Sequence, residues 1–347
     1  MIRVLLVEDS VVQREILRKI LRGEPTITIV GEARNGNEAV RMAHDLAPDV
    51  VLMDIHMPEM NGVDATRAIM GRCPVPIVIV SATLKKRDMD LGVEALHAGA
   101  VSIIAKPKGA VLLNLDKISS KVVDEIVAAS KVKLKPVVPR SSSLKNATQI
   151  ERGEVRLWTD TIEAIGICTS TGGPSVLVEI LSDLPRPFSI PILIVQHISA
   201  GFEESFAGWL SQRTGQPARL ATQGQRLASG MWLAPAGHHL ALLNSRSLTL
   251  LKKSPRDIHC PSGNPLFVSL AERLGPCSAG ILLTGMGDDG ADGLLTLKQA
   301  GGATIIQDEA SSFIWGMPKA GKDLNAATYE LAPRDISLMM TDWNSMP

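Results

Sequence analysis

The sequence predicts an α/β protein built from two doubly wound parallel-sheet domains, the second carrying an antiparallel hairpin. Two observations predict this class. Short apolar runs alternate with amphipathic helical patterns in both halves of the chain, and a basic stretch rich in Pro and Ser separates the halves. The hairpin is predicted by Gly and Asn-Ser turn signals between short apolar runs within residues 218–251.

The first domain is assigned to residues 1–128 on the basis of five strand–helix units. Parallel pairing needs crossover connections, which the intervening helices supply. The strands are expected at Arg3–Val7, Ile27–Glu32, Val50–Met53, Ile77–Ser81 and Ser102–Ala105, and the helices near 11–22, 36–46, 62–70, 86–98 and 111–129. Right-handed crossovers would bring the carboxyl ends of the strands to one edge of the sheet.

A linker is assigned to residues 129–159 because residues 131–147 are basic and rich in Pro and Ser. A solvated tether explains this stretch, and a regulatory surface contact is the alternative. The second domain is assigned to residues 160–347. Its expected strands are Glu163–Cys168, Ile190–Gln196, Gly280–Thr284 and Ala303–Gln307.

Composition narrows the functional classes. The 347 residues are 45% hydrophobic and 21% charged, with 36 basic and 36 acidic side chains, so no basic domain suggests a nucleic-acid partner. No apolar run approaches the roughly 18 residues of a membrane span, and the N-terminus lacks a signal-peptide pattern. The four cysteines form no Cys-x-x-Cys pair, which fits a reducing cytoplasm. We therefore expect a cytoplasmic protein without membrane insertion.

An acidic pocket is predicted at the sheet edge of the first domain. Glu8 and Asp9 end the first strand and Asp54 ends the third. Three carboxylates repel one another unless a cation joins them, and hard oxygen ligands suit Mg²⁺. Ser81 and Lys106 follow the fourth and fifth strands and would bind a phosphoryl group, so Asp54 is the expected phospho-acceptor. Any one of these acids alone could instead cap a helix or lie in a solvated loop.

A hydrolytic site is predicted in the second domain. Ser170 lies on a glycine turn after an apolar run, and His197 follows a second run. A histidine can accept the serine proton, and a buried carboxylate can orient the imidazole. The glycine-rich loop after a third run offers Asp288 and Asp289 for that role and backbone amides for an oxyanion. The G-x-S-x-G elbow is absent. A phosphate cradle at the glycine turn and a core position for His197 are the alternatives.

Residues 1–128 resemble a response-regulator receiver domain, which implies a flavodoxin-like fold. The resemblance rests on the acidic pocket together with Met57-Pro58, Gly62 and Gly99-Ala100. It implies Mg²⁺-dependent phosphorylation of Asp54 by a chemotaxis histidine kinase. One departure is Ile103, three positions before Lys106, where receivers often carry an aromatic residue. The usual serine/threonine–aromatic switch is therefore in question.

Residues 162–340 resemble the catalytic domain of the chemotaxis protein-glutamate methylesterases, the CheB family, which implies a Rossmann-like domain. The matching motifs are Ser170–Gly173, Gln196–Phe202, Ala234–His239, Leu283–Gly290 and Gly316–Pro318. The resemblance implies that Ser170 is the nucleophile, His197 the base and Asp289 the orienting acid. It also assigns the Met286 amide to the oxyanion hole and the Thr171 side chain to its support.

Two departures from the family pattern concern the second site. Asp288 stands where the family commonly has Asn. After Pro-Ser the family usually has Val or Ala, then Asp, then an apolar residue, whereas this chain has Gly263, Asn264 and Pro265, which points to an altered substrate cleft or rim. Three other histidines could line the cleft without forming a compelling metal site: His238, His239 and His259. Three more are expected to be exposed in the first domain: His44, His56 and His97.

These features predict a phosphorylation-regulated carboxyl-ester hydrolase that needs no cofactor for its ester chemistry. The resemblance implies demethylation of glutamyl γ-methyl esters on the cytoplasmic helices of methyl-accepting chemoreceptors, with release of methanol, and deamidation of receptor glutamines as a further activity. The unphosphorylated receiver is expected to cover the catalytic cleft. A receiver-controlled binding module without catalysis is the rival from another class, and a transcription factor is disfavoured by the neutral charge.

Overall fold

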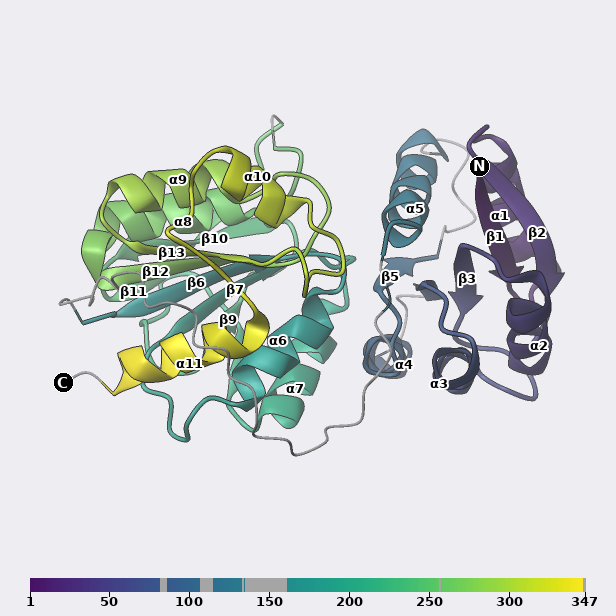
Figure 1. Cartoon of the computed structure of the whole chain (residues 1–347), viewed down its shortest axis with the longest axis horizontal. Helices are drawn as coiled ribbons and strands as arrows, with labels where there is room; N and C mark the ends of the chain where they lie inside the picture. Colours follow the sequence, from purple (N-terminus) through teal and green to yellow (C-terminus); the bar gives the residue numbers. More distant parts are fainter. Residues whose placement is uncertain (82–85, 107–114, 133, 135–160, 256, 346–347) are drawn as a thin grey trace.

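The computed structural model describes residues 1–81, 86–106, 115–132, 134, 161–255 and 257–345. Two α/β lobes lie side by side, with the N-terminal lobe at the right of Figure 1. Most of the assigned linker, Pro107 and the start of the helix expected at 111–129 lie outside the described residues. Among the described residues, no helix is both long and apolar enough to cross a bilayer.

The N-terminal lobe is the predicted doubly wound domain. Its five strands form one parallel sheet in the order β2-β1-β3-β4-β5. The strands are β1 (Ile2–Val7), β2 (Ile27–Ala33), β3 (Val50–Asp54), β4 (Ile77–Ser81) and β5 (Ser102–Ala105), and the helices are α1 (Val11–Arg22), α2 (Gly36–Leu46), α3 (Gly62–Arg72), α4 (Lys86–His97) and α5 (Leu115–Ala129). Helices α1 and α5 cover one face of the sheet, and α2, α3 and α4 cover the other (Figure 1).

The C-terminal lobe contains a seven-stranded parallel sheet in the order β14-β13-β12-β6-β7-β9-β8. Its strands are β6 (Ala164–Thr169), β7 (Ile192–Gln196), β8 (Ala218–Leu220), β9 (Met231–Leu233), β12 (Ser278–Leu282), β13 (Ala303–Gln307) and β14 (Tyr329–Leu331). Helices α6 (Gly173–Ser182), α7 (Glu203–Thr214) and α11 (Pro333–Asn344) cover one face, and α8 (Gly263–Arg273), α9 (Ala291–Gln299) and α10 (Met317–Asp323) cover the other.

The antiparallel hairpin exists, but the expectation for its surroundings was partly wrong. Strands β10 (His238–Asn244) and β11 (Ser247–Lys252) form a separate two-stranded sheet that packs on α8. Met231–Leu233, which the turn-rich texture grouped with the hairpin, instead joins the large sheet as a parallel strand beside β7. Three residues give too short an alternation to reveal such a strand, and the short strands β8 and β14 escaped prediction for the same reason.

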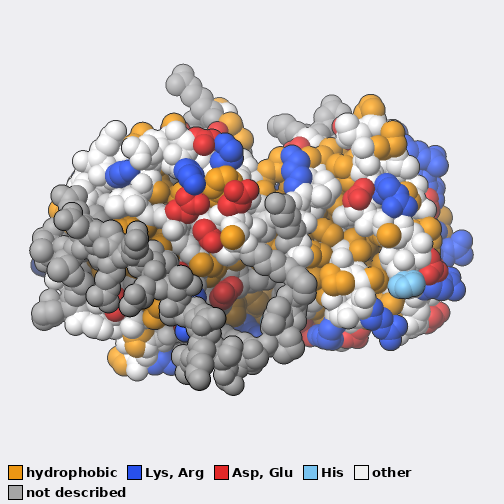
Figure 2. Space-filling model, in the orientation of Figure 1, with side chains coloured by type: hydrophobic (Ala, Val, Ile, Leu, Met, Phe, Trp, Pro, Cys, Tyr) orange, Lys and Arg blue, Asp and Glu red, His pale blue; other side chains and the backbone are white. Residues whose placement is uncertain are grey.

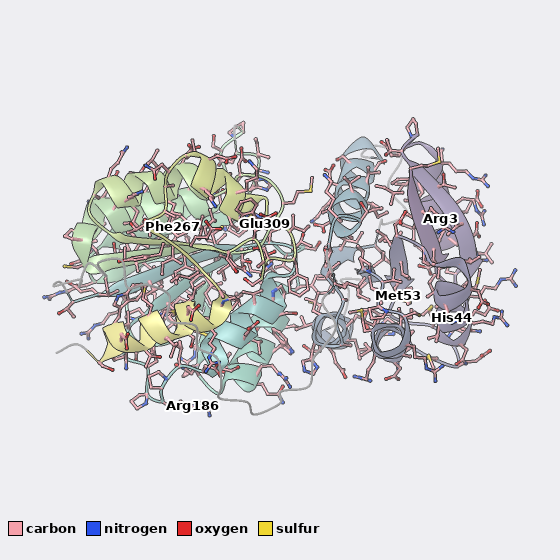
Figure 3. The ribbon with its side chains drawn as sticks, in the orientation of Figure 1. Arg3, His44, Met53, Arg186, Phe267 and Glu309 are labelled. Atoms are coloured by element: carbon pink, nitrogen blue, oxygen red, sulfur yellow. The ribbon has the colours of Figure 1, made fainter. Side chains whose placement is uncertain are left out.

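Each lobe buries its own apolar interior. Met53 of the first lobe and Phe267 of the second are fully buried, and Figure 3 places each inside its lobe. The outer face in Figure 2 instead shows acidic and basic side chains interspersed among apolar ones. Side-chain oxygens of Ser10, Asn35, Asn61 and Ser262 accept backbone amide hydrogens at the starts of α1, α2, α3 and α8, which explains where these helices begin.

The lobes meet through α4, β5 and α5 of the first and through helices α6 and α7 and the strand-end loops of the second. The Gly172 amide donates to the Val101 carbonyl at 3.2 Å, and Lys121 Nζ donates to Ser199 Oγ at 3.0 Å. Phe202 of the C-terminal lobe is fully buried and belongs to an apolar cluster made mostly of first-lobe residues, among them Ile103. The face of the first lobe that carries the departure at Ile103 is thus covered by the second lobe.

Candidate active site and phosphorylation pocket

Ser170 lies where β6 ends and the chain turns sharply into α6. Gly172 adopts a φ of 79°, which disfavours side chains, and a Cβ there would lie 2.5 Å from Phe313 Cβ. The turn is held by two hydrogen bonds: the Ser170 amide donates to the Thr284 carbonyl at 3.0 Å, and Gln196 Nε2 donates to the Ser170 carbonyl at 2.9 Å. The serine is therefore fixed at the carboxyl edge of the sheet.

The three predicted triad residues follow three adjacent strands. Ser170 follows β6, His197 follows β7 on one side, and Asp289 follows β12 on the other. The chain order reverses around β6, and such a switch point opens a crevice at the carboxyl ends of parallel strands. His197 Nε2 lies 2.8 Å from Asp289 Oδ2. The sequence left open whether Asp288 or Asp289 orients His197. In the structure Asp289 is buried and contacts His197, whereas Asp288 is exposed.

Asp289 is held as a charged acceptor. Burial by itself raises the pKa of this carboxyl. Hydrogen bonds from His197, from Ser262 Oγ at 2.5 Å and from the Gly263 amide at 2.8 Å outweigh burial and bring the pKa to about 2. Asp289 can therefore stabilise the imidazolium that forms when His197 accepts a proton.

His197 uses Nε2 for Asp289, so Nδ1 is the ring nitrogen left for the serine proton. Within the described part of the chain, Ser170 Oγ makes no hydrogen bond to this ring. Catalytic hydrogen bonds often tighten only when substrate binds. The arrangement therefore needs a small movement of the serine or the imidazole before proton transfer.

The predicted oxyanion donors lie beside Ser170. A Cβ on Gly285 would lie 2.7 Å from Ser170 Cβ, so the loop backbone approaches the serine closely. The next residue, Met286, keeps a partly exposed side chain. Thr171 is buried, and its carbonyl accepts a hydrogen bond from Thr284 Oγ1 at 3.1 Å. The roles of the Met286 amide and the Thr171 side chain stay predictions.

A small cavity of about 10 Å³ lies between the lobes at the catalytic residues. The C-terminal lobe lines it with Ser170, Thr171 and His197, among others. The N-terminal lobe closes it with residues of α4, β5 and α5: Leu96, Val101, Ser102, Ile103 and Glu125. This volume holds about one water molecule. The N-terminal lobe therefore leaves room beside Ser170 for little more than a water molecule in this arrangement.

The departures at residues 263–265 have a structural explanation that sequence reasoning missed. The Gly263 amide and the neighbouring Ser262 hydroxyl both bind Asp289. A Cβ on Gly263 would lie 2.5 Å from Cys168 Sγ, so glycine makes room for the cysteine of β6. The Asn264 side chain accepts the Gly293 amide at 2.8 Å. The family-like Pro261-Ser262 pair was the sequence feature from which this contact with Asp289 could have been predicted.

The phosphorylation pocket of the N-terminal lobe brings its predicted residues together. Lys106 Nζ lies 2.7 Å from Asp54 Oδ2 and 2.9 Å from Glu8 Oε2. Burial and the nearby Asp54 charge raise the pKa of Glu8 to about 7, and burial raises the pKa of Asp54 despite Lys106. Ser81 is buried at the end of β4, and its hydroxyl lies 3.5 Å from the Asp88 carbonyl.

The acidic residues of this pocket fit a divalent cation. Carboxylate oxygens of Glu8, Asp9 and Asp54 lie within 4.8 Å of one another, and Asp9 is exposed to solvent. Asp54 Oδ1 is buried and, among the described residues, accepts no hydrogen bond. Crowded carboxylates with raised pKa values are what an oxygen-liganded Mg²⁺ would relieve. A second group of possible metal ligands lies at the triad and consists of Cys168, His197 and Asp289. The Asp289 carboxylate, however, already accepts hydrogen bonds from Ser262 and Gly263.

Five of the six other histidines divide into three kinds. His239 is buried and binds Asp257 at 2.9 Å, and its Nδ1 accepts the Ser262 amide. His259 lies against the ring of His197. In the N-terminal lobe His44, His56 and His97 are exposed as expected, although His97 also packs against Trp209 across the lobe boundary.

Comparisons with known proteins cover both lobes. The CheB methylesterase family model matches residues 165–340, and the response regulator receiver domain model matches residues 4–115. A protein-glutamate methylesterase/protein-glutamine glutaminase 2 of Methanospirillum hungatei is 41% identical over 97% of each chain. A protein-glutamate methylesterase/protein-glutamine glutaminase 1 of Syntrophus aciditrophicus is 39% identical over 98% of this chain and 97% of its own. The crystal structure of the Thermotoga maritima CheB methylesterase catalytic domain matches 52% of this chain and 98% of its own, with 30% identity and a TM-score of 0.50.

Proposed function

Because this chain belongs to the CheB methylesterase family and begins with a receiver domain, we propose that it hydrolyses glutamyl γ-methyl esters on methyl-accepting chemoreceptors under the control of phosphorylation. The observation that carries the proposal is the charged, buried Asp289 bound to His197 beside Ser170. This arrangement supplies a base for a serine nucleophile at neutral pH.

The ester chemistry follows from the positions of these residues. Ser170 Oγ attacks the ester carbonyl while His197 accepts its proton, and the Met286 amide binds the developing oxyanion. The tetrahedral intermediate expels methoxide, which takes the proton from His197 and leaves as methanol. Water then attacks the acyl-enzyme with His197 again as base, and the glutamate carboxylate is released. Asp289 stabilises the imidazolium in both halves.

The same residues support deamidation of receptor glutamines as a second activity. The names of the relatives from Methanospirillum hungatei and Syntrophus aciditrophicus include protein-glutamine glutaminase. An amide carbonyl can be attacked by Ser170 as an ester can, and His197 would protonate the departing ammonia. The two substrates differ only in the leaving group.

Regulation is proposed to act through the lobe boundary. The closed cavity at Ser170 supports occlusion by the receiver, and the contact of Lys121 with Ser199 contributes to it. Glu8, Asp9 and Asp54 would hold Mg²⁺, which neutralises the charge of the incoming phosphoryl group. A histidine kinase would supply that group to Asp54. Phosphorylation must then favour an open arrangement by changing the contact energy of this boundary.

The catalytic proposal is tested by methanol release from methylated chemoreceptor. The wild-type chain should release methanol, more with a small-molecule phosphodonor and Mg²⁺ present, and Ser170→Ala should release none above background. A fluorophosphonate probe should label Ser170 in the wild type alone. A chain that binds receptor but neither reacts with the probe nor releases methanol would support the rival binding-module interpretation.

The occlusion proposal needs its own pair of variants. Lys121→Ala removes a partly buried hydrogen bond across the boundary, which is worth about 1 kcal/mol, and should raise basal methanol release several-fold. Lys19→Ala on the exposed face of α1 is the matched control and should change nothing. Equal basal rates for the two variants would contradict a contribution of this contact to inhibition.

A further inference from the structure

The ring of His259 lies flat against the ring of His197. The ring centroids are 4.8 Å apart and the planes differ by 10°. His259 directly precedes the Cys260–Gly263 segment, whose Ser262 hydroxyl and Gly263 amide hold Asp289. One stretch of chain therefore supports two members of the triad, the aspartate by hydrogen bonds and the histidine through its ring face.

We propose that His259 is a positioning residue for the ester hydrolysis assigned above, and that its neutral ring holds the imidazole of His197 in the plane that Asp289 and Ser170 require. The inference rests on the proposed function for its substrate. Its core, control of the reactivity of Ser170 through His197, can be measured without any receptor.

The geometry explains why such a support is needed. Asp289 fixes one edge of the His197 ring through Nε2. A single hydrogen bond at the edge leaves the ring free to tilt about that contact, which would carry Nδ1 away from Ser170. A flat partner at stacking distance limits this tilt. Misplacement of a catalytic group by about 1 Å can lower a rate about 100-fold.

The surrounding charges favour a neutral His259. Its ring is half-buried and is influenced by His197, Asp289, Asp288 and Lys253. Burial, followed by repulsion from His197, lowers the pKa of His259, although the two carboxylates act in the opposite sense. His259 therefore remains uncharged while His197 takes up the serine proton. Two stacked cations would instead oppose that step.

Three variants of the full-length protein test this role. His259→Ala removes the ring, and His259→Phe keeps a flat ring that cannot titrate. His238→Ala is the matched control: the His238 ring is also partly buried in this lobe, and among the described residues it lies within hydrogen-bonding distance of the Ala236 carbonyl only. Thermal unfolding of each variant establishes that it is folded.

Two readouts distinguish positioning from a general structural effect. Methanol release should show kcat lowered about 10- to 100-fold in His259→Ala with KM changed less than about 2-fold, because only the reacting geometry is disturbed. The rate of fluorophosphonate labelling of Ser170 should fall in parallel. His259→Phe should recover both to within about 3-fold of the wild type, and His238→Ala should match the wild type.

The outcomes that overturn the inference are distinct from failure of the proposed function. Equal labelling rates for His259→Ala and His238→Ala would exclude a positioning role. A His259→Phe variant as slow as His259→Ala would mean that an imidazole nitrogen, and not the ring face, is required. If His259→Ala does not fold, His259→Leu, which also lacks a flat ring, replaces it in the comparison with His259→Phe. Absence of methanol release with normal probe labelling in the wild type would refute the substrate assignment and leave this inference standing.

Discussion

Asp54 and Asp289 are two buried aspartates, each at the carboxyl edge of a parallel sheet, with opposite electrostatic character. Asp54 ends β3 of one parallel sheet and Asp289 follows β12 of the other. Burial raises the pKa of Asp54, with Glu8 as a close acidic neighbour and Lys106 as its counter-charge. The pKa of Asp289 is instead about 2, because donors from His197, Ser262 and Gly263 outweigh burial.

The difference reflects what each aspartate does. Asp289 must stay charged and still through every catalytic cycle, so the protein supplies its donors in advance. Asp54 must react with a phosphoryl group, so its pocket keeps acceptor oxygens open to a cation that comes from solution. A preorganised site and a site completed by its ligands can thus both form at the carboxyl edge of a parallel sheet.

The largest expected effect comes from Asp289→Asn. The groups around Asp289 (His197, Ser262 and Gly263) all donate hydrogen bonds, so the NH₂ group of an asparagine would face a donor. A neutral amide also cannot stabilise the imidazolium form of His197. We expect kcat for methanol release to fall by about 10⁴ and the unfolding free energy at pH 7 to fall by about 2 kcal/mol. Steady-state kinetics and urea unfolding measure the two changes. Retention of more than a tenth of wild-type activity would contradict the assigned role.

The same substitution at Asp54 should have the opposite effect on stability. Because burial raises the pKa of Asp54 in the folded state, a neutral side chain is better tolerated there, and Asp54→Asn should raise the unfolding free energy of the metal-free protein. Basal methanol release should persist while stimulation by a phosphodonor is lost. A destabilised Asp54→Asn variant would show that the Lys106 pair outweighs the burial of charge.

A third test concerns the packing behind Asp289. Gly263→Ala would place a methyl group 2.5 Å from Cys168 Sγ and should cost about 1–3 kcal/mol of stability. Cys168→Gly removes Sγ and Cβ, the two atoms that would lie nearest to the methyl group. In a double-mutant cycle measured by urea unfolding, the second change should recover at least about 1 kcal/mol of the first. Strictly additive effects would mean that the two positions do not share this space.

Sequence patterns predicted long elements well, because five repeated strand–helix units in residues 1–128 and three apolar runs ending in Ser170, His197 and Asp289 reinforce one another. Three-residue strands such as Met231–Leu233 carry no periodicity and were missed. The site residues that were missed act through contacts between distant segments. The fit of Gly263 against Cys168 and the stacking of His259 on His197 depend on tertiary packing, which no local spacing records.

The last expected effect is a pH dependence set by Glu8. Its folded-state pKa of about 7 lies above the ordinary value of 4.5, so between these values the folded chain binds more protons than the unfolded chain. The unfolding free energy of the metal-free receiver should therefore fall as pH rises from about 4.5 through about 7, a sign opposite to that contributed by Asp289 at lower pH.

Thermal unfolding in EDTA between pH 5 and pH 8 measures this dependence, and Glu8→Gln should flatten it. Glu94→Gln, an exposed position on α4, is the matched control and should leave the slope intact. Added Mg²⁺ should stabilise the wild type more at pH 8 than at pH 6, because the carboxylates must lose their protons to bind it. If the metal-free receiver instead becomes more stable from pH 5 to pH 8, the proposed difference between the two sites is wrong. Hydrogen bonds and charges of the protein would then stabilise the charged form of Glu8, as they stabilise that of Asp289.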